Sequence, residues 1–325
     1  YPEDPLIPFL RLSAYWQHSL LYDNPESSYE VIENGVRQAI PFYVDMIEKY
    51  PDEQKYNLFL GSLYGLKARV DLAQSDWMGL IVSGSRGFRY ISEAIEEDPY
   101  LYDAYMPIGT LEYFLCRSNS ALQMIGKLFG LKSDCKEAVR KLELSSSNAE
   151  YSWVEAKNVL SYIYLYIEKD YFKAYNVSNS LTQSFPGHPF FLYLEAESLI
   201  KLKEYEEFNK IEDKLVEFHK EGPINQQREC YDKYIYLNAL KSFQDKNYNL
   251  AIKFSSEVIN NYDIEFKWVL GYSHLIRGQS LELMGNRPIA IADYKKAIKY
   301  LDNYPDQVDA QSLVKSSIPE ILENR

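Results

Sequence analysis

The hydrophobic positions along the chain follow a helical pattern nearly throughout. Near the C-terminus, Leu275, Gly278 and Leu281 recur at a spacing of three residues, and Tyr294 and Ala297 do the same further on. Such spacings place the residues on one face of a helix. Alternation with a period of two between hairpin turns is absent from the sequence. We therefore expect almost no strand, and roughly sixteen helices joined by short connections.

The predicted helices pair, and the pairs repeat. One second helix opens with Asp170-Tyr171, and the next opens 34 residues later with Glu204-Tyr205. Further second helices open with Asn247-Tyr248 and with Arg287-Pro288, at intervals near 40 residues. A period of this length is typical of stacked helix–turn–helix units.

Small and large residues alternate at the positions where such helices would meet. The last unit has Gly278 in its first helix, followed by Ala290, Tyr294 and Ala297 in its second. A small residue lets two helix backbones approach, and the facing aromatic ring fills the gap between them. Earlier units keep this alternation with substitutions at Leu160, Ser161, Tyr164, Ala174, Ala196, Leu199, Phe208, Ala239, Ala251 and Val258.

At these positions the chain resembles the tetratricopeptide repeat family, over about residues 54–303 and most closely after Tyr151. The resemblance implies an all-α fold, a right-handed superhelix of antiparallel helix pairs with helical caps. Phe208 departs from the family pattern because it replaces the usual small residue. The stretch that begins at Asp103 is also similar to a group of bacterial envelope repeat proteins and, more distantly, to a eukaryotic organelle-associated repeat family.

The repeats predict four regions. Residues 1–50 form two helices that cap the solenoid, because the first repeat would otherwise expose its core. Residues 51–150 form degenerate repeats with an inserted short helix at 118–131. Residues 151–305 form the repeats that most resemble the family, and residues 306–325 form a C-terminal capping helix.

The insertion at 118–131 is too apolar for a solvated loop. Its large apolar residues are Leu122, Met124, Ile125, Leu128 and Phe129. We therefore expect a short helix that folds onto the solenoid.

Charge narrows the range of partners. The chain of 325 residues has 35 basic and 47 acidic residues, a net charge of −12. A chain this acidic gains nothing from counterion release, so no nucleic-acid partner is expected. Anionic membrane surfaces are expected to repel it, whereas a basic partner is compatible. No run of 18 uncharged apolar residues occurs, so no transmembrane segment is expected.

The three cysteines, Cys116, Cys135 and Cys230, are too few and too widely spaced for a disulfide framework or a zinc site. The favoured interpretation is that most of them are small buried residues. The alternative is that Cys116 and Cys135, which flank the insertion, pair in an oxidising compartment. The chain opens without an initiator Met, which is compatible with a removed signal segment. A periplasmic, envelope or secreted location is then expected, with the cytoplasm as the alternative.

The sequence offers no constellation of catalytic or metal-binding residues. The four histidines are scattered over separate helix pairs without metal-ligand spacing. The run from Ser83 to Gly87 lacks the ending of a phosphate loop, so Gly84 and Gly87 are expected to permit close helix packing instead. We expect no catalytic residue, no metal and no cofactor.

Aromatic residues on the first helices are the candidate binding surface, because first helices line the concave side of such a stack. The chain has 30 tyrosines. The candidate partner-binding residues are Tyr105, Tyr162, Tyr166, Tyr193, Tyr236, Trp268 and Tyr272. These rings could form a trough for an extended peptide or an amphipathic helix. The alternative is that the tyrosines replace other large core residues.

Three function classes follow. The leading hypothesis is a non-enzymatic scaffold that binds a protein or peptide segment along its concave groove. The second is a small-ligand protein for a lipid, glycan or metabolite, with a pocket closed by residues 118–131. The third is self-assembly through a terminal cap, and the oligomeric state stays open.

Overall fold

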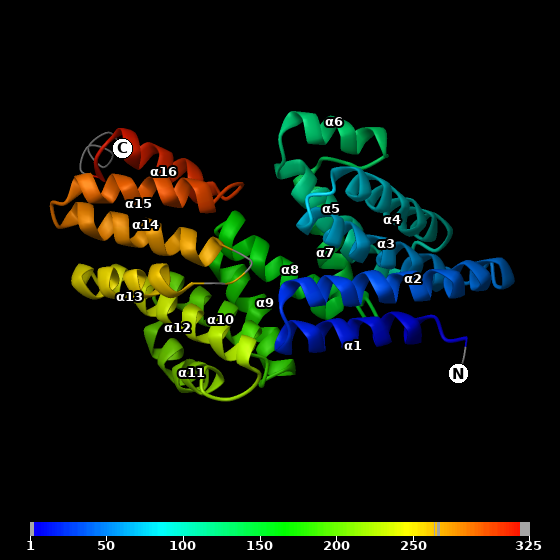
Figure 1. The fold of residues 1–325 in the computed structure, drawn as a ribbon, viewed down its shortest axis with the longest axis horizontal. Coiled ribbons are helices and arrows are strands. Elements are labelled where there is room, and N and C mark those ends of the chain that lie inside the picture. The colour runs from blue at the N-terminus through cyan, green and yellow to red at the C-terminus, as the bar shows by residue number, and fades with distance from the viewer. Residues whose placement is uncertain (1–2, 263, 265–266, 319–325) are drawn as a thin grey trace. The chain divides into compact units, whose positions relative to one another are not determined.

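The structure is a computed structural model that describes residues 3–262, 264 and 267–318. Its described part contains helices and no strand (Figure 1). The α-helices are α1 (Leu6–Tyr22), α2 (Pro25–Lys49), α3 (Lys55–Ala73), α4 (Trp77–Glu97), α5 (Tyr105–Arg117), α6 (Ser120–Leu128), α7 (Cys135–Asn148), α8 (Trp153–Tyr162), α9 (Tyr171–Ser184), α10 (Pro189–Leu202), α11 (Tyr205–Phe218), α12 (Ile224–Gln244), α13 (Tyr248–Asn261), α14 (Trp268–Leu283), α15 (Arg287–Tyr300) and α16 (Pro305–Lys315). A 3₁₀ turn, η1 (Tyr102–Ala104), precedes α5, and a π-helical turn, η2 (Ile163–Ile167), continues α8.

The chain divides into two compact units, residues 1–160 and residues 161–325. In the N-terminal unit α2 packs on α1 and α3, α3 on α4, and α5 on α7. In the C-terminal unit the pairs are η2 with α9, α10 with α11, α12 with α13, and α14 with α15, followed by α16 against α15. The predicted all-α fold of antiparallel helix pairs is confirmed in each unit.

The turn inside each C-terminal pair repeats the same backbone geometry. Lys169, Lys203, Lys246 and Gly285 all have positive φ, between 55° and 86°, and each lies two residues before the second helix. This left-handed conformation ends one helix and reverses the chain. The second helices α9, α11, α13 and α15 begin at Tyr171, Tyr205, Tyr248 and Arg287, each within one residue of the opening that the sequence predicts.

Side-chain caps fix where two of these helices, α9 and α13, start. The Asp170 carboxylate accepts the backbone N–H of Lys173 at 3.1 Å, and the Asn247 amide oxygen accepts that of Leu250 at 3.3 Å. Such bonds satisfy N–H groups that have no partner within the helix. The repeat is therefore encoded locally as well as by its core.

Small residues do bring helices together, at some of the predicted positions. A Cβ on Gly278 would lie 2.7 Å from the Tyr294 ring, and one on Gly87 would lie 2.8 Å from the carbonyl oxygen of Gly61. These contacts confirm close packing at Gly278 and Gly87. Gly84 is different, because a Cβ there would meet nothing within 4 Å.

The favoured interpretation of the cysteines is wrong for two of the three. Cys116 and Cys135 form a disulfide with their Cα atoms 5.6 Å apart, and Cys230 is free and half-buried. The pairing is possible because α5 and α7 pack side by side, which brings the two ends of the insertion together. Sequence spacing alone does not show this proximity.

The insertion contains the predicted short helix, α6, but the helix lies differently from what its apolar content suggests. Its five large apolar residues are exposed, whereas Gly126 is the buried residue of the helix. The C-terminal helix, α16, is present and packs against α15. Residues 319–325 of the predicted cap lie outside the described residues. No helix in the described part of the chain is long and apolar enough to cross a membrane.

Candidate functional site

The seven candidate aromatic residues divide between the two units. Tyr105, the first residue of α5, belongs to the N-terminal unit, where its hydroxyl donates to the Pro99 carbonyl at 3.1 Å. The other six belong to the C-terminal unit. Their ring positions there define one aromatic cluster, formed by Tyr162, Tyr166, Tyr193, Tyr236, Trp268 and Tyr272.

Tyr166 and Trp268 lie at the centre of this cluster. The two ring centroids are 4.7 Å apart, and that of Tyr272 lies 5.9 Å from Tyr166. Tyr236 contacts both Trp268 and Tyr272, at 6.4 and 6.3 Å. All of these rings but that of the half-buried Tyr162 are buried. The structure therefore brings six of the seven predicted residues together, mainly as a core rather than as an open trough.

A buried carboxylate organises the cluster. Glu197, fully buried on α10, accepts the Tyr166 and Tyr193 hydroxyls at 2.6 and 3.0 Å on one oxygen. Its other oxygen accepts the Tyr236 hydroxyl at 2.9 Å. Burial raises the pKa of Glu197 against the opposing effects of Lys201 and the tyrosine hydrogen bonds. Burial also raises the pKa of the three phenols, so each hydroxyl keeps its proton and donates.

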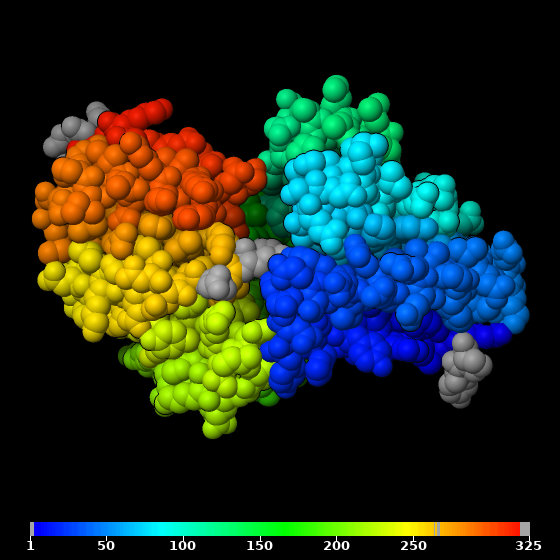
Figure 2. Space-filling view, viewed as in Figure 1, coloured from blue at the N-terminus to red at the C-terminus, as the bar shows by residue number. Residues whose placement is uncertain are grey.

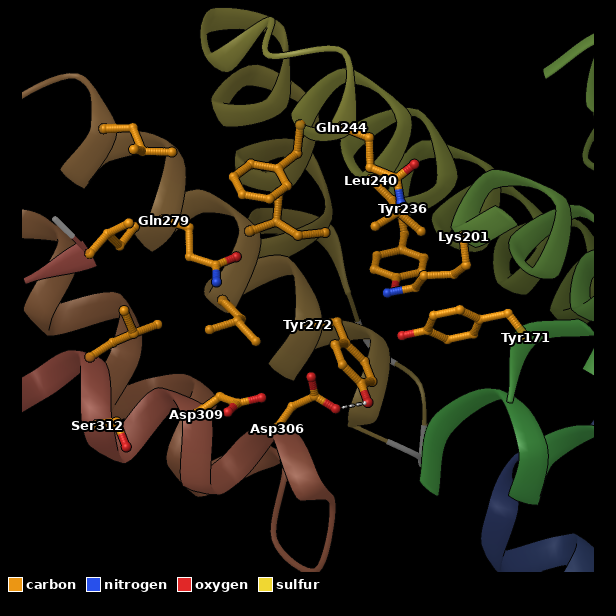
Figure 3. A pocket seen from close by; sticks show the side chains of 16 residues that line it. Tyr171, Lys201, Tyr236, Leu240, Gln244, Tyr272, Gln279, Asp306, Asp309 and Ser312 are labelled. Atoms are coloured by element: carbon orange, nitrogen blue, oxygen red, sulfur yellow. Dashed lines mark hydrogen bonds between the residues drawn. The ribbon is translucent and has the colours of Figure 1, made fainter. Parts of the chain in front are cut away.

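An open groove of about 540 Å³ lies beside this cluster, within the C-terminal unit (Figure 3). The first helices α10, α12 and α14 contribute to its wall, together with the start of α9, with α16 and with Ile318. We call it the C-terminal groove. It is lined by Tyr171, Lys201, Tyr236, Leu240, Phe243, Gln244, Tyr272, Leu275, Ile276, Gln279, Leu283, Asp306, Asp309, Ser312, Leu313 and Ile318. Of the candidate aromatics, Tyr236 and Tyr272 reach it.

Charges of opposite sign lie on opposite sides of the groove (Figure 3). On one side, the Lys201 ammonium lies 5.9 Å from the Tyr171 ring centroid and 5.8 Å from that of Tyr272. On the other side, α16 contributes Asp306 and Asp309. Asp306 accepts the Tyr272 hydroxyl at 2.9 Å, which ties the aromatic cluster to the acidic side.

One cation serves both acids of α16. The Lys169 ammonium lies 3.0 Å from Asp306 and 3.3 Å from Asp309. Asp309 is exposed, so its carboxylate remains open to a second cation. The α16 side of the groove thus keeps a net negative charge.

For several residues of this site, the sequence does not predict a place in the groove. Glu197 carries a weak signal, because it is an acid inside the apolar run from Leu192 to Ile200. Lys201, Asp306 and Asp309 carry none, since charged residues near helix ends are ordinary on a solvated surface. Only the folded chain shows that they face one groove.

Groups suited to a metal are absent from the described residues, where no cluster of three or more His, Cys, Asp or Glu side chains could hold an ion. His274 is buried, and its Nδ1 lies 2.8 Å from the Asp293 carboxylate. Arg277 donates to the same carboxylate at 2.7 and 2.8 Å. This network joins α14 to α15, and Arg277 also donates to the Ser256 hydroxyl on α13 at 3.1 Å.

Comparison with known proteins identifies no family. No protein-family model matches the chain, and no curated protein matches it. Eleven chains of solved structures match, among them yeast Tom70, with a TM-score of 0.47 and 11% sequence identity. That match covers 90% of this chain and 60% of the Tom70 chain.

Proposed function

We propose that this protein is a non-enzymatic scaffold that binds a protein or peptide segment in the C-terminal groove. The observation that carries the proposal is the composition of the wall, in which three successive first helices and α16 present side chains to one open channel. Helix stacks of this kind create extended concave surfaces suited to peptides.

Apolar side chains supply the binding surface. Leu240, Phe243 and Leu275 line the channel together with Leu283 and Leu313. A partner segment that inserts apolar side chains here would remove surface from water on both molecules, which favours association. Leu283 is 40% exposed and Phe243 is half-buried, whereas Leu240, Leu275 and Leu313 are buried. In the free protein, Leu283 and Phe243 therefore supply the solvated part of this surface.

Polar groups at the two sides supply orientation. The half-buried Lys201 has no carboxylate in contact among the described residues, so its ammonium can bind a carbonyl or an acid of the partner. Asp309 can bind a Lys or Arg, because Lys169 is shared between two acids. The groove therefore favours a segment with apolar residues next to a basic one, which suits the chain's charge of −12.

The aromatic cluster keeps the wall rigid. Glu197 and its three tyrosines connect η2, α10 and α12 behind the groove. A wall that is ordered before binding loses little conformational entropy when the partner arrives. The candidate aromatics then act mainly by holding the groove in shape, with Tyr236 and Tyr272 also forming part of its surface.

The resemblance to bacterial envelope repeat proteins belongs to the same proposal. Its support is the Cys116–Cys135 disulfide, because such bonds persist in oxidising compartments. We propose that the protein works in one.

Capture with matched variants tests the groove. Leu283→Asp places a charge on the channel wall, and Leu250→Asp makes the same change on α13 at a residue that is also 40% exposed. In affinity capture from native extract, we expect Leu283→Asp to reduce the retained partner about tenfold or more, since charge burial disrupts an apolar contact. Leu250→Asp should retain it. Equal retention by both variants would contradict the proposal.

A further inference from the structure

The helix α6 turns its apolar side outward. Met124 and Leu128 are 63% and 79% exposed, and Leu122, Ile125 and Phe129 are also exposed. The side that faces the rest of the unit carries Gly126, which is buried, and Gln123. An amphipathic helix of a globular protein normally directs its apolar side to the core. Here the direction is reversed.

Specific contacts hold α6 in this orientation. A Cβ on Gly126 would lie 2.3 Å from a methyl carbon of Leu115, so the missing side chain lets α6 lie against α5. The Gln123 amide donates to the backbone carbonyls of Cys116 and Ser118 at 3.1 and 2.9 Å. The disulfide to Cys135 then closes the base of the insertion. These contacts therefore fix the orientation in which the apolar side of α6 faces outward.

The charge of this segment differs from that of the chain. Residues 117–133 contain Arg117, Lys127 and Lys132 and no acidic residue, although the whole chain has a net charge of −12. All three basic residues are exposed. Large apolar side chains flanked by exposed cations are typical of helices that lie in the interface of an anionic membrane.

We propose that the α6 segment, residues 117–133, is a peripheral membrane anchor for bilayers that contain anionic lipid. Met124, Leu128 and their apolar neighbours would enter the boundary between headgroups and acyl chains. Arg117, Lys127 and Lys132 would contact lipid phosphates. Figure 2 shows the segment as a projection at one edge of the N-terminal unit, which is the shape that a flat surface can accept.

Repulsion between like charges favours lipid over a second copy of the chain. A symmetric contact between two α6 segments would place both sets of three cations beside each other, which costs free energy.

The negative charge elsewhere on the chain predicts repulsion from an anionic membrane, but salt screens it beyond about 10 Å. The local cations therefore decide the interaction once the segment is in contact. The inference concerns the N-terminal unit and is independent of the C-terminal groove.

Vesicle co-sedimentation of the full, oxidised chain tests this anchor. Vesicles of phosphatidylcholine alone are compared with vesicles that contain phosphatidylglycerol at about a third of the lipid. We expect binding to the mixed vesicles, at least tenfold weaker binding to the neutral ones, and loss of binding at high salt. Removing the charges of Lys127 and Lys132 should weaken binding roughly fivefold for each cation.

A matched pair of triple variants shows whether vesicle binding depends on the apolar residues of α6 or on exposed apolar residues in general. Met124→Ser with Ile125→Ser and Leu128→Ser should reduce vesicle binding more than tenfold. Phe172→Ser with Ile289→Ser and Val308→Ser removes comparably exposed apolar side chains from the C-terminal unit and should leave binding unchanged. Circular dichroism serves to check that both variants are folded.

Three results would overturn the inference. The first is absence of wild-type binding to the mixed vesicles. The second is equal binding by the two triple variants. The third is a wild-type dimer in light scattering that the α6 triple variant abolishes, without vesicle binding by either protein, since that result assigns the apolar side to a second copy.

Discussion

The buried carboxylates of the C-terminal unit differ in the hydrogen-bond donors that they meet, and their pKa values shift in different directions. Asp293 is buried, yet hydrogen bonds from His274 and Arg277 outweigh the cost of burial and lower its pKa. Glu197 has three hydroxyl donors and a raised pKa. Asp232 is 3% exposed, and its Oδ2 has no hydrogen-bond partner among the described residues.

Asp232 should therefore make stability depend on pH. Burial raises its pKa from 3.8 to about 6. Between these values the native carboxyl binds more protons than the unfolded one, so the free energy of unfolding falls as pH rises through this window. Asp232→Asn does not titrate and should raise the unfolding free energy by about 1–2 kcal/mol at pH 7.5, because a neutral amide costs less to bury than a carboxylate.

Urea unfolding at several pH values measures this effect. The gain of Asp232→Asn over wild type should be complete above pH 6 and shrink toward pH 4. Asp213→Asn is the control, because Asp213 is exposed on the neighbouring helix α11. A gain for Asp232→Asn that does not change with pH would exclude titration of this carboxyl as its cause.

At the scale of elements, the helices could be predicted because their signals are local. The starts of α9, α11, α13 and α15 follow from a repeated turn, and those of α9 and α13 also from a capping side chain, which all act through neighbours in the chain. The orientation of α6 could not, because it depends on Gly126 meeting Leu115. The Cys116–Cys135 pairing likewise requires the packing of α5 against α7.

The close approach of α3 and α4 gives a test within one helix. Gly87→Ala would place a methyl group 2.8 Å from the Gly61 carbonyl oxygen, and the backbone cannot yield cheaply. We expect a loss of about 1–3 kcal/mol in stability from overpacking. Gly84→Ala, three residues earlier in α4, meets open space and should be neutral or gain about 0.5–1 kcal/mol from helix propensity.

Thermal unfolding followed by circular dichroism compares the two variants directly. A lower midpoint for Gly87→Ala than for Gly84→Ala is the predicted order. The reverse order would show that the two helices do not meet at Gly61 and Gly87.

At the scale of the whole molecule, the sequence indicates which helices line a groove better than it indicates which side chains do. The repeat pattern predicts that first helices form the wall, and α10, α12 and α14 contribute to it. The aromatic residues on them are mostly buried. The sequence does not indicate this, because tyrosine fits both a core and a surface pattern. Distinguishing the two requires knowing that Glu197 draws Tyr166, Tyr193 and Tyr236 inward.

Site-specific photo-crosslinking in native cells tests the central claim most directly. A photoreactive amino acid at Gln279, which lines the C-terminal groove, is compared with one at Lys296, an exposed position on the second helix α15. We predict that Gln279 yields a crosslink to a discrete protein, that Lys296 does not, and that Leu283→Asp abolishes the Gln279 product. No protein crosslink at Gln279, or the same products at both positions, would contradict the assignment of the groove as the binding surface.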